Sequence, residues 1–165
     1  MIELSYRTAE RADAMAISVL VKDALQPVTL PGWTSEAVSS LFAKASPKAM
    51  IEHIGGAAFA HVSIDAGRVV GFILCKSWRF LNLLVVEPSL QRQGIGSYLV
   101  NLLFRHLTDA TPDLSVVEVN ATRYSLPFYR RLGFYPLSDF IDFDGCHFAR
   151  LGYWRKNPLL PTSEC

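Results

Sequence analysis

One stretch decides the fold of this chain: Leu83-Leu84-Val85-Val86-Glu87-Pro88-Ser89-Leu90-Gln91-Arg92-Gln93-Gly94-Ile95-Gly96-Ser97. The apolar run at its start predicts a buried strand, which ends at Pro88 because proline cannot donate to a strand ladder. Gly94 and Gly96 then open an amphipathic helix. Because no bulky side chain covers it, the partly positive start of this helix is open to a phosphate. The stretch therefore predicts a strand–loop–helix unit that binds a phosphate-bearing molecule.

Length and composition are those of one globular domain. The chain has 165 residues, of which 50% are hydrophobic and 19% are charged, enough for one buried core. We expect a single domain over residues 1–165, with a polar, proline-containing tail over about 157–165. The net charge of +1 gives no field that would favour nucleic acid or an anionic membrane, so neither is expected as a partner.

Signals for secretion, membrane insertion and metal binding are missing from the sequence. The N-terminal residues lack the basic segment and apolar core of a secretory signal, and no segment reaches the roughly 20 apolar residues of a membrane span. Cys75, Cys146 and Cys165 are widely scattered, and neither they nor the four histidines have the spacing of a zinc site. We expect a cytoplasmic protein with reduced cysteines and no metal.

Hydrophobic periodicity on both sides of the stretch predicts an α+β fold with a mixed sheet. Helices are expected over residues 9–25, 35–45, 47–53, 95–107 and 126–132, with Thr8 as the N-cap of the first. Strands are expected over residues 2–7, 57–64, 69–75, 80–86, 116–120, 134–140 and 147–153. The short links at 65–68 and 144–145 predict antiparallel hairpins.

Two nucleotide-binding patterns are excluded at the glycine loop. A dinucleotide fold requires Gly-x-Gly-x-x-Gly after the first strand of a βαβ repeat, but here the third glycine position is Leu99 and the unit lies in mid-chain. A P-loop requires Gly-Lys-Ser/Thr, which does not follow. A purely structural alternative, in which Gly94 and Gly96 only allow tight packing of strand and helix, stays open.

Two segments together resemble the GCN5-related N-acetyltransferases. The run Leu84-Val85-Val86-x-Pro88, followed by Gln91-Arg92-Gln93-Gly94-Ile95-Gly96, looks like the family's motif A, Gln/Arg-x-x-Gly-x-Gly/Ala. The segment from Asn120 to Phe134 resembles its motif B and ends in Phe128-Tyr129-Arg130-Arg131-Leu132-Gly133-Phe134. The matching region, about 81–134, covers a third of the chain. The resemblance implies the family's fold, a twisted and mostly antiparallel sheet of 6–7 strands with one splayed strand pair and helices on both faces.

The resemblance further implies acetyl-CoA as the acyl donor and an amine as the acceptor. The pyrophosphate of the cofactor would lie on the amides of the loop, whose residues are Gln91, Arg92, Gln93, Gly94, Ile95, Gly96 and Ser97. The backbone of Leu84, Val85 and Val86 would pair with the pantetheine arm as a neighbouring strand does. Asn120 would contact the cofactor or organise the splayed strand.

Tyr129 matches the general-acid tyrosine of the family. Phe128 and Leu132, four residues apart, are expected to form the buried stripe of the short helix, which would turn Tyr129 in another direction. A thiol titrates at about 8.5 and a tyrosine at about 10, so proton transfer to the departing thiolate is uphill by roughly 2 kcal/mol, which local polarisation can remove. The alternative that Tyr129 only packs stays open.

The general base is less well defined by the sequence. Glu118 shares a strand face with Asn120, so it is the candidate that could take the proton of the amine. A solvent-exposed strand glutamate would show the same pattern, and this alternative stays open. Glu52, His53 and His61 are further candidates, although a helix end or a half-buried strand explains them equally well.

The acceptor is expected to bind between the loop Gln26–Thr34 and the segment Asp139–Leu151, which in this family shape the acceptor site. Their aromatic residues, Trp33, Phe140, Phe143 and Phe148, favour an amine attached to an apolar or planar body, and Asp139, Asp142 and Asp144 add carboxylates. We therefore expect a small-molecule N-acetyltransferase. A protein N-terminus or lysine as the acceptor, and a non-catalytic acyl-CoA sensor, are the alternatives. A homodimer is left open.

Overall fold

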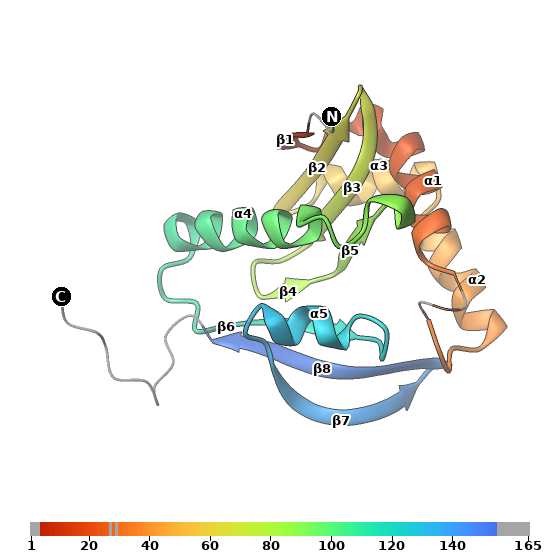
Figure 1. Cartoon of the computed structure of the whole chain (residues 1–165), viewed down its shortest axis with the longest axis vertical. Helices are drawn as coiled ribbons and strands as arrows, with labels where there is room; N and C mark the ends of the chain where they lie inside the picture. Colours follow the sequence, from red (N-terminus) through yellow and green to blue (C-terminus); the bar gives the residue numbers. More distant parts are fainter. Residues whose placement is uncertain (1–3, 27, 29, 155–165) are drawn as a thin grey trace.

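Helices and strands fill the part of the chain that the computed structural model describes, residues 4–26, 28 and 30–154 (Figure 1). The expected tail over residues 157–165 lies outside the described residues, as do the first two residues of the expected N-terminal strand. In chain order the elements are β1 (Leu4–Thr8), α1 (Ala14–Ala24), α2 (Ser35–Lys44), α3 (Pro47–Gly55), β2 (Phe59–Asp65), β3 (Arg68–Cys75), β4 (Phe80–Leu81), β5 (Leu83–Val86), α4 (Ile95–Ala110), β6 (Val116–Ala121), α5 (Leu126–Arg131), β7 (Tyr135–Phe143) and β8 (Cys146–Trp154).

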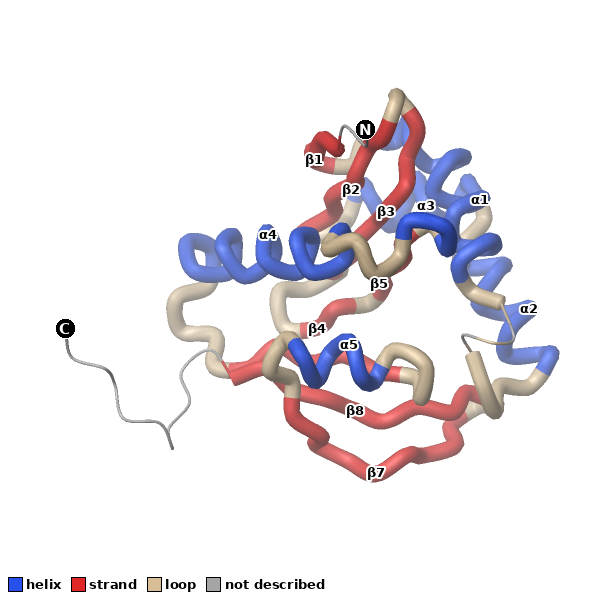
Figure 2. The backbone as a smooth tube through the Cα atoms, viewed as in Figure 1, coloured by secondary structure: helices blue, strands red, loops and turns tan. Residues whose placement is uncertain are grey.

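The strands form two four-stranded sheets, in the orders β1-β2-β3-β5 and β4-β6-β8-β7 (Figure 2). Among the described strands every pair is antiparallel except β4 with β6, which is parallel. The α4 helix covers one face of the first sheet, α1 covers the other, and α5 lies over the second sheet (Figure 1). The expected mixed, mostly antiparallel sheet with helices on both faces is confirmed.

The expected strand over residues 80–86 is divided into β4 and β5, and this division separates the two sheets. Leu81 and Leu84 both pack into the core under α4, although strand alternation would place them on opposite faces. Leu83 packs on the other side, in the core under α1. One extra residue, Asn82, therefore interrupts the strand as a bulge does. As a result β4 pairs with β6 and β5 pairs with β3, which confirms the expected splayed strand pair.

The first helix begins later than the sequence predicts. Thr8 is not its N-cap, because Thr8 is the last residue of β1 and its backbone pairs with β2. The helical segment instead starts at Glu10, whose side chain and that of Asp13 accept each other's backbone N–H. Two hydrogen bonds from Arg7 to Asp13, of 2.7 and 2.8 Å, fix this turn and lower the pKa of the Asp13 carboxyl.

The α4 helix packs closely on β3. Its buried stripe contains Ile95, Leu99 and Leu103. At Gly71 of β3 a Cβ atom would lie 3.1 Å from the Cγ2 atom of Ile95 and would overlap the hydroxyl of Ser63. Glycine at this position therefore sets how closely the helix approaches the β2–β3 pair.

Replacement of Gly71 by alanine tests this close approach. G71A should lower the free energy of unfolding by about 2 kcal/mol, because the added methyl group overpacks the contact between β3 and α4. Denaturant titration followed by circular dichroism measures the change.

Ser63 provides the control, because its buried hydroxyl has no hydrogen-bond partner in the described structure. S63A should leave stability unchanged or raise it slightly. In the S63A background G71A should cost about 1 kcal/mol less, since the nearest clash has been removed. An equal cost of G71A in both backgrounds would contradict this explanation of the packing.

Candidate active site

The glycine loop joins β5 to α4 through a short 3-10 turn over Pro88–Leu90. Gly94 is the N-cap residue of α4 and has a φ of +87°, a left-handed conformation that glycine adopts without strain. A Cβ atom at Gly94 would meet nothing within 4 Å outside its chain neighbours. No side chain caps the helix, so the N–H groups of its first turn are open to an anion.

The side chains of the loop differ in exposure. Arg92 and Gln93 are exposed, Gln91 and Ser97 are half-buried, and Ile95 is buried in the core and offers only its backbone. Arg92 also has a φ of +65°. This conformation costs of order 1 kcal/mol for a residue with a side chain and is typical of ligand-binding segments.

Contacts connect the loop to the start of α5. The Gln91 side chain donates to the carbonyl of Val86 (3.2 Å) and accepts from the hydroxyl of Tyr124 (2.9 Å). A Cβ atom on Gly96 would lie 3.3 Å from the ring of Phe128, so glycine also allows α4 and α5 to pack closely. The two segments that the sequence singles out, far apart along the chain, therefore meet at one place.

The β5 strand leaves one edge of its backbone free. Glu87 donates its N–H to the carbonyl of Val70 on β3, and antiparallel ladders use every second residue in this way. Val85 therefore also turns its backbone toward β3, while its side chain is buried under α1. Leu84 and Val86 turn their N–H and C=O groups the other way, toward β6. Among the described residues no second strand pairs with β5 on this side, and the Val86 carbonyl accepts only the side chain of Gln91 (3.2 Å). A strand edge without a partner strand therefore lies inside the protein.

The strands β5 and β6 are not paired with each other, and we call the region between them the gap. The two sheets meet at the pair Leu81 and Val119, and beyond it β5 and β6 follow different partners. Asn120 is the first residue of β6 past this apex, and its side chain is exposed. The glycine loop lies at the other end of β5, four residues or roughly 13 Å away. The diverging strands therefore have the uncapped start of α4 toward one end and the strand junction at the other.

Tyr129 of α5 lies on the core side of this junction. Its side chain is 5% exposed and makes edge-to-face contacts with Phe128 and Phe134, at ring-centre distances of 5.1 and 5.3 Å. The expectation that Phe128 and Leu132 form the buried stripe of this helix is wrong, because both are only half-buried and Tyr129 is the residue of α5 that enters the core. Leu126, Phe128 and Leu132 pack at the border of the same core, and Tyr129 is the residue of α5 that is fully buried in it.

The surroundings of Tyr129 favour protonated groups. Burial raises the pKa of its phenol, and the nearby Cys75 thiol raises it further. Cys75 follows Leu74, whose partner on β5 is Leu83, so the thiol lies at the level of the apex. Burial also raises the pKa of Cys75 from 9.0 to about 12. Burial therefore disfavours both the tyrosinate of Tyr129 and the thiolate of Cys75.

Glu118 and Asn120 share the opposite face of β6, away from the buried side chains of Val117 and Val119. The Glu118 carboxylate is 3.2 Å from Arg79 Nη2 and 3.8 Å from Arg150 Nε. The Arg150 Nε group also donates to the side-chain oxygen of Asn120 (3.4 Å).

Neither arginine was predicted from the sequence. Only the register of β8 on β6, which pairs Asn120 with Arg150, brings the guanidinium to this face. Arg79 reaches Glu118 because the parallel pairing of β4 with β6 begins beside it, where the Glu118 N–H donates to the Arg79 carbonyl (2.8 Å).

The other candidates for a base lie away from the gap. His61 is on β2, with β3 and β5 between it and β6, and its ring stacks on Phe59 (4.3 Å). It lines a cavity of about 200 Å³ together with His106. Burial and then the neighbouring His106 lower the pKa of His61. Glu52 and His53 are on α3, which packs against α1 in the core on that side of the first sheet.

The loop after α1 docks on the turn of the β7–β8 hairpin. Trp33 donates its indole N–H to the carbonyl of His147 (3.0 Å), and Thr34 donates its N–H to the carbonyl of Gly145 (2.9 Å). The His147 ring is hydrogen-bonded to Asp142 (2.8 Å) and to Arg123 (3.3 Å). The two segments that are expected to shape the acceptor site therefore lie together.

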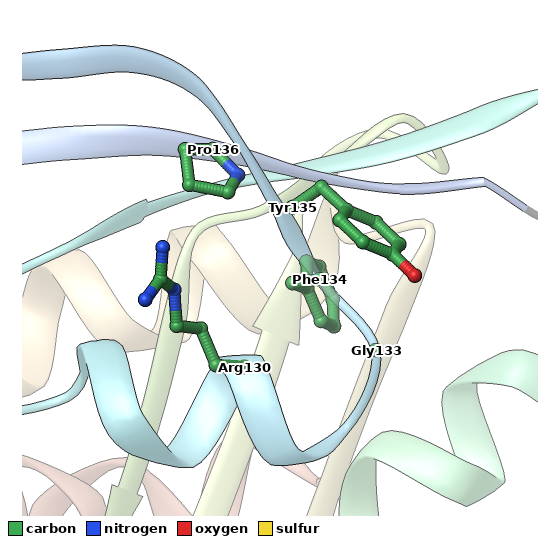
Figure 3. Close-up of a pocket in the computed structure, with 5 residues that line it drawn as sticks. All are labelled: Arg130, Gly133, Phe134, Tyr135 and Pro136. Carbon is green, nitrogen blue, oxygen red and sulfur yellow. The ribbon is translucent and has the colours of Figure 1, made fainter.

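A larger surface hollow, of about 260 Å³, lies where α5 leads into β7 (Figure 3). Its lining residues are Arg130, Gly133, Phe134, Tyr135 and Pro136. Figure 3 shows the Arg130 side chain rising from α5 toward Pro136. None of the residues that the sequence singles out as site residues lines this hollow, so it is separate from the gap.

Metal-binding groups and membrane-spanning helices were both looked for among the described residues. Within them, no group of three or more histidine, cysteine, aspartate or glutamate side chains is arranged to hold a metal ion. The helices found there are all too short or too polar to cross a membrane.

Comparison with known protein families gives one match. The family model described as "Acetyltransferase (GNAT) domain" matches residues 29–152, a range that contains the glycine loop, the gap and α5. No curated protein matches the sequence.

Solved structures share the fold over nearly the whole chain. A GCN5-related N-acetyltransferase from Rhodopseudomonas palustris superposes with a TM-score of 0.79, at 14% identity, over 93% of this chain and 98% of its own. PaiA N-acetyltransferase from Thermoplasma acidophilum, solved with coenzyme A, gives 0.72 at 17% identity over 90% and 98%. The ribosomal-protein-S18-alanine N-acetyltransferase from Escherichia coli gives 0.66 at 15% over 96% and 99%. At these identities the likeness shows a common fold.

Proposed function

This chain belongs to the acetyltransferase (GNAT) family, and we propose that it transfers the acetyl group of acetyl-CoA to a primary amine of a small molecule. One observation carries the proposal: the gap between β5 and β6 has the uncapped start of α4 at one end and the buried phenol of Tyr129 at the other. An anion site at one end of the gap and a proton donor at the other would suit a long substrate with a pyrophosphate and a reactive sulfur.

The residues around the gap fit acetyl-CoA. The pyrophosphate would accept hydrogen bonds from the amides between Gln91 and Ser97, with Arg92 as a charged partner. The pantetheine arm would lie along β5 and pair with the backbone groups that Leu84 and Val86 turn away from β3, apart from the Val86 carbonyl, which accepts from the side chain of Gln91. Asn120, on β6, would contact the cofactor or organise the splayed strand. The thioester would then lie near the apex.

The reaction is a direct attack of the amine on the thioester. The C–N bond forms first and gives a tetrahedral intermediate, whose oxyanion would be stabilised by an N–H group of β5. Collapse breaks the C–S bond and leaves a thiolate, which takes the proton of Tyr129. Burial disfavours the tyrosinate, but the environment that raises the pKa of Cys75 to about 12 also makes the thiolate a stronger base. Proton transfer therefore stays within the reach of general acid catalysis.

Glu118 is the proposed acceptor of the amine proton. It lies on the exposed face of β6 beside Asn120, which is the first residue past the apex. Its carboxylate contacts Arg79 and Arg150, so it can also serve to hold these two side chains.

A protein N-terminus or a lysine side chain is the alternative acceptor to a small molecule. One similar structure, the enzyme from Escherichia coli, is named for the N-terminal alanine of a ribosomal protein. A panel of small amines and peptides with acetyl-CoA, followed by release of free thiol, decides between these classes. Tight binding of acetyl-CoA without transfer to any amine or peptide would instead support a sensor.

Substitution of Gly94 tests the phosphate site. G94E should weaken binding of coenzyme A by roughly 100-fold or more, because it places a carboxylate where the pyrophosphate would lie and removes a favourable left-handed glycine. Isothermal titration calorimetry measures the affinity, and circular dichroism confirms the fold.

Gly67, at the turn between β2 and β3, supplies a matched control. It has a φ of +78°, and a Cβ atom there would also meet nothing within 4 Å. G67E should therefore introduce a similar backbone strain and leave coenzyme A affinity within about twofold of the parent value. Unchanged affinity in G94E would mean that the phosphates bind elsewhere.

Substitution of Tyr129 tests the general acid. Y129F keeps the ring in the core and removes only the hydroxyl, so kcat should fall by roughly 100-fold while the affinity for coenzyme A stays the same. Y153F is the control, because Tyr153 belongs to the same aromatic cluster and lies 5.5 Å from Phe134. If Y129F turns over at the parent rate, Tyr129 only packs.

Substitution of Glu118 separates its two roles. If Glu118 is the base, E118Q should lower kcat by roughly 100-fold, and the acidic limb of the pH profile should disappear. If Glu118 only holds the two arginines, E118Q should change KM for the amine and leave kcat and the pH profile unchanged. E52Q is the control, since Glu52 is exposed on α3.

A further inference from the structure

The face of β6 and β8 beside the gap carries an arginine, Arg150, whose contacts to its neighbours involve only one of its three side-chain nitrogens. Arg150 of β8 is fixed through its Nε atom, by Asn120 at 3.4 Å and Glu118 at 3.8 Å, and its guanidinium lies 6.0 Å from the ring centre of Phe80. Among the described residues neither of its two terminal nitrogens has a hydrogen-bond or ion-pair partner. The side chain is 48% exposed, so these nitrogens are accessible.

The charge of this face is positive. Arg79 directs both its Nε and its Nη2 atoms to a single oxygen of Glu118, at 3.3 and 3.2 Å. Glu118 therefore offsets one of the two arginines and leaves a net positive charge beside Asn120. The acidic residues of the hairpin are all exposed: Asp139 lies in the β7 segment opposite Arg150 but forms no ion pair with it, and Asp142 is bonded to His147. A polycationic acceptor would be repelled from this face.

The β7 strand bends away at the same position. Its register on β8 runs from Pro136 opposite Leu151 to Phe140 opposite Ala149, so three residues of β7 face the single residue Arg150. The Arg150 N–H, deprived of a carbonyl partner by this bulge, donates instead to the hydroxyl of Ser138 (3.1 Å). The bulge therefore keeps the backbone of Arg150 satisfied while the strands separate around it.

We infer that the free end of the Arg150 guanidinium binds an oxyanion of the acceptor, so that the acceptor is a primary amine that also carries a carboxylate or a phosphate. A guanidinium with two unpaired terminal nitrogens presents the two-pronged donor that both groups accept. The register puts Arg150 opposite Asn120, one residue past the apex where the thioester would lie. An acceptor held by its anionic group at Arg150 would place its amine toward the apex. This inference rests on the proposed acetyl transfer and narrows its substrate class.

Matched pairs of amines test the inference. The panel contains the proteinogenic amino acids with their amides, phosphoethanolamine with ethanolamine, and two polycations, spermidine and kanamycin. Each anionic member should be acetylated with a kcat/KM roughly 10- to 100-fold above its neutral partner. Comparison of the amino acid pairs with the phosphate pair tells which oxyanion the site prefers. A preference for the amides or the polycations would overturn the inference.

Substitution of Arg150 assigns the preference to this side chain. R150Q should lower kcat/KM for the anionic amines by roughly 10- to 100-fold, mainly through KM, and leave the neutral amines within about twofold. R150K should keep part of the preference, because it retains the charge but not the fork. R105Q, an exposed arginine of α4, is the matched control and should change nothing.

A binding measurement makes the test independent of turnover. The same pairs are titrated calorimetrically into the full-length protein loaded with coenzyme A. Tighter binding of the acids than of the amides, lost in R150Q, supports the inference even if the conditions allow no transfer. Equal binding of acids and amides, equal binding by the parent and R150Q, or no binding of any acid overturns it. Failure of coenzyme A itself to bind would instead refute the proposed function.

Discussion

The structure depends on one interrupted strand. At Asn82 the backbone N–H donates to the carbonyl of Leu74 (2.9 Å), and the side-chain oxygen accepts the N–H of Lys76 (2.7 Å). These two bonds hold one extra residue in a central strand, so that β4 continues into one sheet and β5 into the other. A free strand edge normally lies at the surface, where water satisfies it. Here it lies between two sheets, and the backbone groups that Leu84 and Val86 turn away from β3 have no partner strand among the described residues. A ligand that hydrogen-bonds as a strand does could take that place.

The same interruption explains where the chemistry can occur. The core under α4 extends to the junction of the sheets and encloses Cys75 and Tyr129. Low polarity there keeps the phenol protonated and favours a protonated sulfur. The opposite face of β6 is charged and open, with Glu118 between two arginines. A reacting thioester at the junction would therefore have an apolar acid side and a polar acceptor side, separated by the width of one strand.

Local patterns predicted much of the fold. The glycine loop with the α4 helix after it, and the β2–β3 and β7–β8 hairpins, all follow from residues close together in the sequence. Three features did not. The first helical segment starts after Glu10 and not after Thr8, because Thr8 is paired in β1 and strand pairing overrides a local cap. Tyr129 entered the core because the packing of a six-residue helix is set by its neighbours. Arg150 reached the gap through a strand register that no single stretch of sequence encodes.

The most direct test is a crystal structure of the protein with coenzyme A. The pyrophosphate should lie on the amides at the start of α4, the pantetheine arm should bond to Leu84 and Val86, and the sulfur should lie roughly 3 Å from the hydroxyl of Tyr129. A cofactor bound outside the gap, or a sulfur on the far side of β6 from Tyr129, would contradict this view of the split strand as the site of acetyl transfer.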